Sequence, residues 1–275
     1  MLLQKNKCFS VLPGFIRSLV RKNCSLLELG KGTNLSELAT VPTLYFPVNC
    51  VVVMTATSAQ QRGSFLRFGG SGVVLQVHPG KALPELDLTV TVCGGGYAFA
   101  VPADVLWSHL ASPHELTTAK LKLLYSITQH ALMSARCASS HTTSQRLARI
   151  LLEVAQEFGS DQSIPLTQEE FARLLSVRRE TVTQLFSEWS ASHIVETARS
   201  RIVLRNRAKL EAQSCACFSI AATLNNDDFA LWSEIQWKNA SDIGSLSEPT
   251  VMTEGPTPTV DRTARADRLP SLRKG

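Results

Sequence analysis

The chain has 275 residues, of which 44% are hydrophobic and 19% charged, and its formal net charge is +5. Its length has room for two ordinary domains, and its composition excludes a chain that is disordered throughout. The most apolar run, Val51 to Met54, is too short to cross a bilayer, and the N-terminus shows no secretory pattern. The cysteines form neither a CxxC pair nor a Cys/His zinc ladder, so we expect a cytoplasmic protein in a reducing compartment.

The segment from Val41 to Val101 is rich in Val, Thr and Gly, which predicts several short strands. Apolar and polar residues alternate from Leu86 to Val92, as in a half-buried strand. The glycines Gly94 to Gly96 lie between this strand and another apolar run, and no Lys-Ser or Lys-Thr follows them as in a phosphate-binding loop. We therefore interpret them as a hairpin turn. Residues 1–24 carry no clear signal and are treated as a leader.

A long helix is predicted to begin at Ser112, because a capping Ser is followed by Pro113 and then by Glu115. Its apolar residues keep near-heptad spacing, so the helix could pack on a second copy of itself or simply cover the β domain. They are Leu116, Ala119, Leu123, Leu124, Ile127 and Ala131. Another amphipathic helix is predicted from about Thr143. After residue 222 the chain is polar and then rich in Pro and Thr, so we expect a disordered tail.

Two short helices joined by a tight turn are predicted between residues 165 and 191. The first begins with the capping box Thr167-Gln-Glu-Glu170 and has an apolar side at Phe171, Leu174 and Leu175. The chain breaks at Ser176, and the second helix buries Val182, Leu185, Phe186 and Trp189. This order of elements is the helix-turn-helix pattern.

The polar side of the second helix carries side chains that can hydrogen-bond base edges, near the end of the helix that enters the major groove. These are Arg178, Arg179, Glu180, Thr183 and Gln184. Thr167 and Gln168 begin the first helix, where backbone N–H groups favour phosphate. Two short strands follow with a basic turn containing Arg199 and Arg201, as in a wing. A small helical subdomain with a solvated face is the alternative, but the basic hairpin favours a winged helix.

The string LTQEEFARLLSVRRETVTQLFSEWSASHIVETARSRIVLRNRAKLEAQSCAC, together with RLARILL at Arg146 to Leu152, resembles the C-terminal domain of the Crp/Fnr family of bacterial transcription regulators. Cys137-x-x-x-His141 resembles a motif of one branch of that family, and Leu210-Glu211 with Cys215 loosely matches its Cys-rich end. The resemblance is specific over about residues 130–217. It is looser over residues 25–110, where Tyr45-Phe46-Pro47 and the glycine turns resemble the family's β-roll.

The resemblance implies an α+β fold: an N-terminal antiparallel β-roll, a double-stranded β-helix like a jelly roll, then a dimerisation helix and a winged helix-turn-helix. The expected boundaries are a leader at 1–24, a cyclic-nucleotide-binding-like β-roll at 25–111, the dimerisation helix at 112–141, the DNA-binding domain at 142–222 and the tail at 223–275. It implies a homodimer that reads a near-palindromic operator through residues 178–190. Arg179, Glu180 and Gln184 match base-reading positions, and Thr167 and Gln168 match phosphate contacts. Double-stranded DNA, a second copy and RNA polymerase are the expected partners, and no membrane is expected.

Three departures from the family pattern carry further expectations. Ser176, His193 and Ser200 stand where the family often has Gly. A residue other than Gly that is forced to positive φ costs about 1 kcal/mol, so we expect a winged domain that is less stable than its relatives or has adjusted turns. The segment Leu75 to Val92 has no Arg that could neutralise a cyclic-nucleotide phosphate, so we expect neither cyclic AMP nor cyclic GMP to bind.

Third, Cys8 and Cys24 lack the clustered spacing of the family's iron-sulfur sensors, so we expect no cofactor and no metal. Cys93 and Cys137 are expected to be buried as small hydrophobic residues, and His141 to be a capping or core residue. Cys215 and Cys217 stay open between exposed, redox-active thiols and inert ones.

A protein-interaction or ligand-sensing module with a degenerate, weakly DNA-binding helix-turn-helix is the alternative function, because the three turn substitutions would allow it. A steep salt dependence of DNA affinity would separate the two readings. No Ser/His/Asp or paired-carboxylate constellation stands out in the sequence, so we expect no enzyme.

Overall fold

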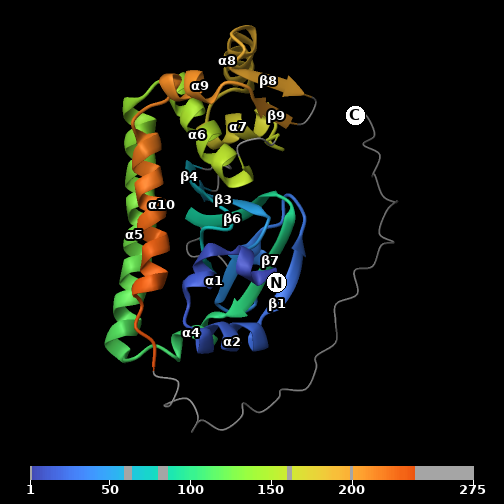
Figure 1. Cartoon of the computed structure of the whole chain (residues 1–275). Helices are drawn as coiled ribbons and strands as arrows, with labels where there is room; N and C mark the ends of the chain where they lie inside the picture. The colour runs from blue at the N-terminus through green and yellow to red at the C-terminus, as the bar shows by residue number, and fades with distance from the viewer. Residues whose placement is uncertain (1, 59–63, 80–85, 160–162, 199–200, 239–275) are drawn as a thin grey trace, which may run out of the picture.

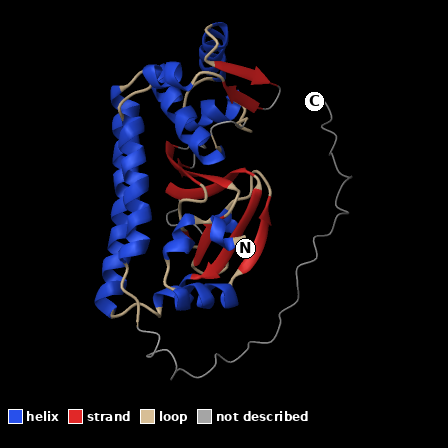
Figure 2. Cartoon of the chain, viewed as in Figure 1, coloured by secondary structure: helices blue, strands red, loops and turns tan. Residues whose placement is uncertain are grey.

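The computed structural model describes residues 2–58, 64–79, 86–159, 163–198 and 201–238. It confirms the expected α+β class, with a β-roll, a long helix and a winged helix-turn-helix in that order (Figures 1 and 2). Within these residues no helix is both long and apolar enough to cross a membrane.

The β-roll consists of two antiparallel sheets. One has the strand order β1 (Ser25–Leu29), β7 (Gly96–Pro102), β2 (Thr43–Pro47) and β5 (Leu75–Val77), and the other β4 (Ser64–Gly69), β3 (Val51–Ser58) and β6 (Leu86–Gly94). The alternating segment predicted as a strand lies in β6, where Val90 and Val92 are buried and Thr89 and Thr91 half-buried. Gly95 joins β6 to β7, but these two strands belong to different sheets, so the glycines form a turn between the sheets and the expected hairpin is wrong.

The segment expected to be a leader contributes to the core through its described residues, 2–24. They form a 3-10 turn and two helices whose buried residues include Phe9, Ile16 and Val20. Phe9 meets Phe46 of β2 edge to face, with ring centroids 6.3 Å apart. The helices of this half are η1 (Leu3–Lys5), α1 (Lys7–Val11), α2 (Gly14–Asn23), α3 (Leu35–Leu38) and α4 (Ala103–Trp107).

Helix α5 (Pro113–Ser140) begins as predicted, because the Ser112 side chain accepts a hydrogen bond from the Glu115 N–H and Pro113 opens the first turn. Most of the predicted apolar stripe packs against the rest of this chain. Ala119 is buried, and Leu116, Leu123 and Ala131 pack against the core. Leu124 is the exception, since its side chain is exposed. The stripe read from the sequence therefore covers this chain's own domain.

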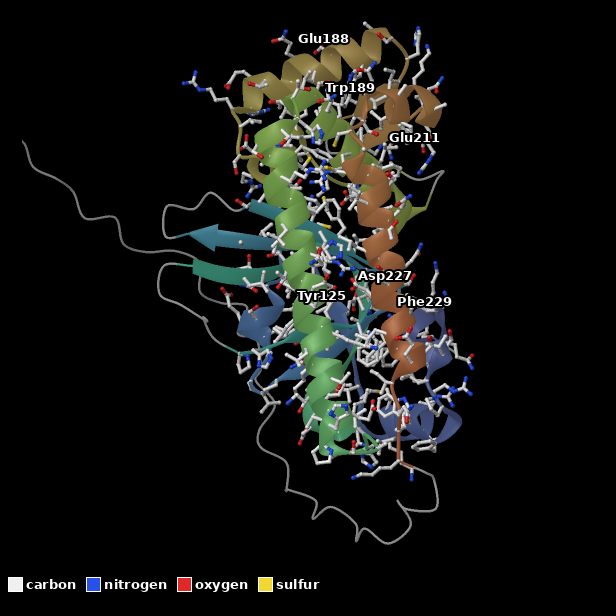
Figure 3. The ribbon with its side chains drawn as sticks, turned by 90° about the vertical axis from the view of Figure 1, so that its left-hand side faces the viewer. Tyr125, Glu188, Trp189, Glu211, Asp227 and Phe229 are labelled. Atoms are coloured by element: carbon white, nitrogen blue, oxygen red, sulfur yellow. The ribbon has the colours of Figure 1, made fainter. Side chains whose placement is uncertain are left out.

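The expectation of a tail from residue 223 is wrong for its first part. Residues Cys217–Glu234 form helix α10, which runs alongside α5 (Figures 1 and 3). Trp232 is buried and stacks on Trp107 with ring centroids 5.9 Å apart. The polar residues that suggested a loop include Asp228, which is paired with Arg67. The remainder of the expected tail, 239–275, lies outside the described residues.

The winged helix-turn-helix comprises α6 (Thr143–Phe158), α7 (Gln168–Leu175), α8 (Arg179–Ala191), β8 (Val195–Ala198), β9 (Arg201–Leu204) and α9 (Arg207–Gln213). Its core is continuous with one face of the β-roll, where Val53 and Phe65 belong to the same cluster as Leu151. Lys31, in the loop after β1, reaches this domain and donates to the Pro165 carbonyl and the Glu170 carboxylate. The body of the domain thus rests on the β-roll, and α8 lies at the far end of the molecule (Figure 1).

Candidate nucleic-acid interface

The first helix of the motif, α7, is built around the predicted capping box. The Thr167 hydroxyl accepts a hydrogen bond from the Glu170 N–H at 3.2 Å, and the Glu170 carboxylate accepts from the Thr167 N–H at 2.7 Å. The buried side of α7 carries Phe171 and Leu175. Phe171 packs on Phe186 of α8 with ring centroids 5.7 Å apart, and this aromatic contact sets the two helices against each other.

The turn between the helices is tight because Ser176 adopts the left-handed conformation, with φ 55° and ψ 41°. The N–H groups of Ser176 and Val177 donate to the Arg173 and Ala172 carbonyls at the end of α7. Arg178 then takes extended backbone geometry and starts α8. This turn leaves the N-terminal end of α8 uncovered.

Helix α8 has one buried and one exposed side, as its spacing predicts. Val182, Phe186 and Trp189 are buried. The opposite side presents polar residues to solvent, all of them exposed: Arg178, Arg179, Glu180, Thr183, Gln184, Ser187 and Glu188. The five predicted base-reading residues are therefore brought together on one accessible face. Glu188 lies farther along α8 and points outward as well (Figure 3).

Several of these side chains have neighbours within the domain. The Thr183 hydroxyl donates to the Gln168 side-chain oxygen at 2.7 Å, so a predicted phosphate contact and a predicted base contact touch each other. Gln184 donates to Glu188 at 3.0 Å, and the Arg179 Nε lies 3.9 Å from the Glu169 carboxylate. The Arg179 and Glu169 side chains are 66% and 53% exposed, so their ion pair is weak and open to exchange for another acceptor.

The predicted wing is present as a two-stranded antiparallel ribbon of β8 and β9. Arg201 begins β9 and is exposed. Arg199 and Ser200 lie outside the described residues. At the base of the ribbon, Arg205 forms an exposed ion pair with Glu196, so this arginine is already engaged with a carboxylate.

Residues 145–213 match the family model of the Crp-like helix-turn-helix domain. The similarity in fold covers more of the chain than this domain. The chain resembles the structure of a putative transcriptional regulator of the crp/fnr family from Eubacterium rectale. The TM-score is 0.57 and the identity 15%, over 74% of this chain and 96% of that one. Residues 145–213 therefore form a Crp-like helix-turn-helix domain, and the chain has the fold of this structure.

Another similar structure is FixK2 from Bradyrhizobium japonicum, with a TM-score of 0.55 and 18% identity over 70% of this chain and 98% of that one. At these identities the Crp/Fnr structures establish the fold of the chain. No curated protein matches it.

Two of the three glycine departures in this Crp-like domain can be tested on the backbone. Ser176 and His193 both have φ 55°, so each places a side chain in the left-handed region that favours glycine. The expectation that these positions need positive φ is confirmed. His193 follows α8, and the Ile194 N–H closes the turn by donating to the Trp189 carbonyl at 2.8 Å.

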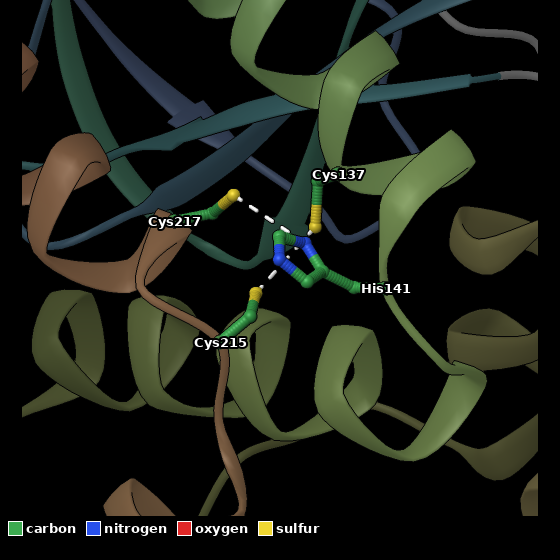
Figure 4. A group of neighbouring side chains, drawn as sticks. All are labelled: Cys137, His141, Cys215 and Cys217. Carbon is green, nitrogen blue, oxygen red and sulfur yellow. Dashed lines mark hydrogen bonds between the residues drawn. The ribbon is translucent and has the colours of Figure 1, made fainter.

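Sequence reasoning missed a group of four side chains beside this Crp-like domain. Cys137 and His141 lie at the end of α5, Cys215 lies between α9 and α10, and Cys217 is the first residue of α10 (Figure 4). Their ligand atoms all lie within 4.8 Å of one another. The two short spacings, Cys-x-x-x-His and Cys-x-Cys, were the available signal, but 73 residues separate them.

The burial of these cysteines settles a point that the sequence left open. Cys93 and Cys137 are buried as expected, and Cys215 and Cys217 are buried too, so neither is an exposed thiol. His141 occupies the C-cap of α5, which is one of the two roles expected for it. The expectation of no metal rested on the spacing of Cys8 and Cys24 and on the lack of a CxxC pair or a Cys/His ladder, none of which concerns the four residues that the fold brings together here.

Proposed function

We propose that this protein is a cytoplasmic, sequence-specific DNA-binding transcription regulator that acts as a homodimer and inserts α8 into the major groove. The observation that carries the proposal is the exposed polar face at the N-terminal half of α8 in a Crp-like helix-turn-helix. Its arginines can donate to guanine O6 and N7, Glu180 can accept from cytosine N4, and Gln184 can pair with adenine. Thr167, Gln168 and the wing arginine Arg201 would contact the backbone.

A second copy of the chain is the expected partner because α5 has an apolar face that this chain does not cover. Its large residues are exposed at 60% for Leu121, 61% for Leu124, 66% for Tyr125 and 59% for Leu132. Leu121, Tyr125, Thr128, Leu132 and Ala135 alternate spacings of four and three residues, which is the spacing of a coiled-coil seam with one polar position at Thr128. Figure 3 shows Tyr125 on this outward face.

Two copies joined along this seam would present two recognition helices to half-sites about 34 Å apart on a near-palindrome. This places the dimer contact on a different side of α5 from the stripe read in the sequence. Contact with RNA polymerase stays a prediction of the family resemblance. We propose no enzymatic role.

Regulation by a cyclic nucleotide is not part of the proposal. The β-roll interior is filled by apolar side chains such as Tyr45, Met54 and Leu66. Among the described residues of the β-roll, Arg67 is the buried cation, and it is already paired with Asp228. A buried phosphate without a cation would be strongly destabilising. Calorimetry that found micromolar affinity for cyclic AMP or cyclic GMP would contradict this.

The salt dependence of DNA affinity tests the proposal. A regulator that neutralises about six phosphates should lose about 10³-fold in affinity between 50 and 200 mM salt, because counterions are released on binding. The operator should first be selected from random DNA with the full-length protein. A flat salt response, with no sequence enriched, would instead support a degenerate helix-turn-helix that binds a protein or small ligand.

The dimer is tested by light scattering coupled to size-exclusion chromatography. Leu121→Glu combined with Leu132→Glu should convert the dimer to a monomer and weaken binding to the palindrome more than to a single half-site. Leu38→Glu is the matched control, because it makes the same change at an exposed leucine of α3. A double variant that stays dimeric would place the interface elsewhere.

A further inference from the structure

The group formed by Cys137, His141, Cys215 and Cys217 lies where three parts of the chain meet. Cys137 sits one turn before the end of α5 and His141 caps it, so both face the start of the helix-turn-helix domain. Cys215 precedes α10 and Cys217 is its first residue. The four side chains therefore connect the long helix to the segment that leaves the winged domain.

Two distances within the group fit a single tetrahedral ion, and all four ligand atoms lie within 4.8 Å of one another. The Sγ atoms of Cys137 and Cys215 are 3.6 Å apart, and the Cys217 Sγ lies 3.7 Å from the His141 Nδ1. An ion with bonds of about 2.3 Å to sulfur and about 2.0 Å to nitrogen requires ligand atoms roughly 3.5 to 3.8 Å apart. All four side chains turn toward a common point (Figure 4).

Three sulfurs and one imidazole nitrogen are the ligand types that zinc takes in closed structural sites. The three cysteines are buried, so the site would have no open position for a substrate. Three thiolates around a divalent cation leave a net charge of −1. The Arg149 guanidinium interacts electrostatically with Cys137 and Cys217, and Arg146 with Cys137 and Cys215, so positive charge is close by.

Two other uses of the group fit less well. In a four-iron cluster each ligand binds a different iron, so the ligand atoms must lie farther apart than around one ion. A disulfide between Cys137 and Cys215 would need the sulfurs to approach to about 2.05 Å and would leave His141 and Cys217 without a role. A single ion uses all four residues.

We propose that Cys137, His141, Cys215 and Cys217 bind one structural zinc ion, which fastens the start of α10 and the end of α9 to the end of α5. Binding would hold the helix-turn-helix domain at one orientation to the long helix, because both of its chain connections to α5 and α10 pass through the site. The ion stabilises the folded chain, since the four ligands come together only on folding.

Elemental mass spectrometry of the full-length protein, purified without chelator or affinity metal, tests the proposal. About one zinc per chain is expected. Cobalt substituted for zinc should give the visible absorption of tetrahedral cobalt thiolate. Neither measurement depends on a variant, so both remain informative if a substitution prevents folding. A folded, metal-free protein that also fails to take up zinc or cobalt would overturn the proposal, whether its cysteines are reduced or joined as a disulfide.

Variants assign the ligands. Cys215→Ser and His141→Ala should each lower the bound zinc and the melting temperature. Cys24→Ser is the matched control, because Cys24 lies at the end of α2 outside the group and should leave the zinc content unchanged. If zinc is retained at full stoichiometry and affinity in both ligand variants, the ion sits elsewhere.

Discussion

Arg67 of β4 and Asp228 of α10 form an ion pair between segments 161 residues apart in the chain. Arg67 also donates to the Asn225 side-chain oxygen at 3.0 Å, and Asp228 lies 3.3 Å from the His130 Nε2 of α5. The network joins the β-roll, the long helix and the last helix. Because the side chains of Arg67 and Asp228 are only 9% and 15% exposed, neither charge can be left to water alone.

Loss of one member should destabilise the fold. Asp228→Ala leaves the Arg67 guanidinium enclosed without its carboxylate and should lower the free energy of unfolding by about 3 kcal/mol. Urea denaturation measures this. Asp227→Ala removes a carboxylate from the adjacent, exposed position (Figure 3) and should change stability by less than about 0.5 kcal/mol. Equal effects of the two variants would mean that the buried pair adds little.

His130 should make stability fall in mild acid. Burial lowers the pKa of His130, although the hydrogen bond to Asp228 opposes this. Arg67, Arg149 and Asp228 are the charged groups that act on it. Since an ionised carboxylate only accepts, Nε2 carries the hydrogen, and Nδ1 is a buried nitrogen with no hydrogen-bond partner among the described residues. A second proton would have no acceptor there.

The sign follows from proton linkage. The unfolded chain takes up a proton near pH 6.5 and the folded chain only at lower pH, so the unfolded state binds more protons in this window. Stability is therefore full above about pH 6.5 and falls as the pH drops toward the lowered pKa. His130→Gln should show a smaller loss of stability between pH 7.5 and 5.5 by urea denaturation. An unchanged pH slope in that variant would show that another group is responsible.

His193→Gly should stabilise the winged domain. The φ of 55° at His193 strains any residue with a Cβ, so glycine should raise the free energy of unfolding by about 0.5 to 1 kcal/mol. His193→Ala removes the same exposed imidazole and keeps the Cβ, so it should give no gain. Thermal unfolding of the unchanged protein and the two variants shows whether the backbone or the loss of the imidazole causes the gain in stability.

Arg179 and Arg201 should differ in how they affect DNA binding. Arg179→Ala should weaken binding to the selected operator by about 1 to 3 kcal/mol and spare most of the affinity for random DNA, because a base contact is lost. Arg201→Ala should weaken both by similar factors and reduce the salt slope by about one unit. Footprinting titrations on the two DNAs measure this. Equal loss on both DNAs for Arg179→Ala would contradict its base-reading role.

The sequence by itself determined the helix-turn-helix, because its signals are local. The capping box at Thr167, the cap at Ser112 and the apolar spacing of Val182, Phe186 and Trp189 act within one or two helical turns. The turn at Ser176 was also expected from the sequence. Its positive φ was expected because the resembling family often has Gly at this position. The same local reasoning identified the alternating strand in β6, but not that the turn at Gly95 passes from one sheet to the other.

Only the tertiary structure decided how separate segments are used. Helix α10 looks like a loop in sequence because its polar residues find their partners, such as Arg67, far away in the chain. Periodicity shows that α5 has apolar residues, but not which of its sides the chain covers, so the exposed seam at Leu121 and Leu132 emerged only from packing. Cys137 and Cys215 are 78 residues apart, and no local rule relates side chains that meet only after α6 to α9 have folded between them.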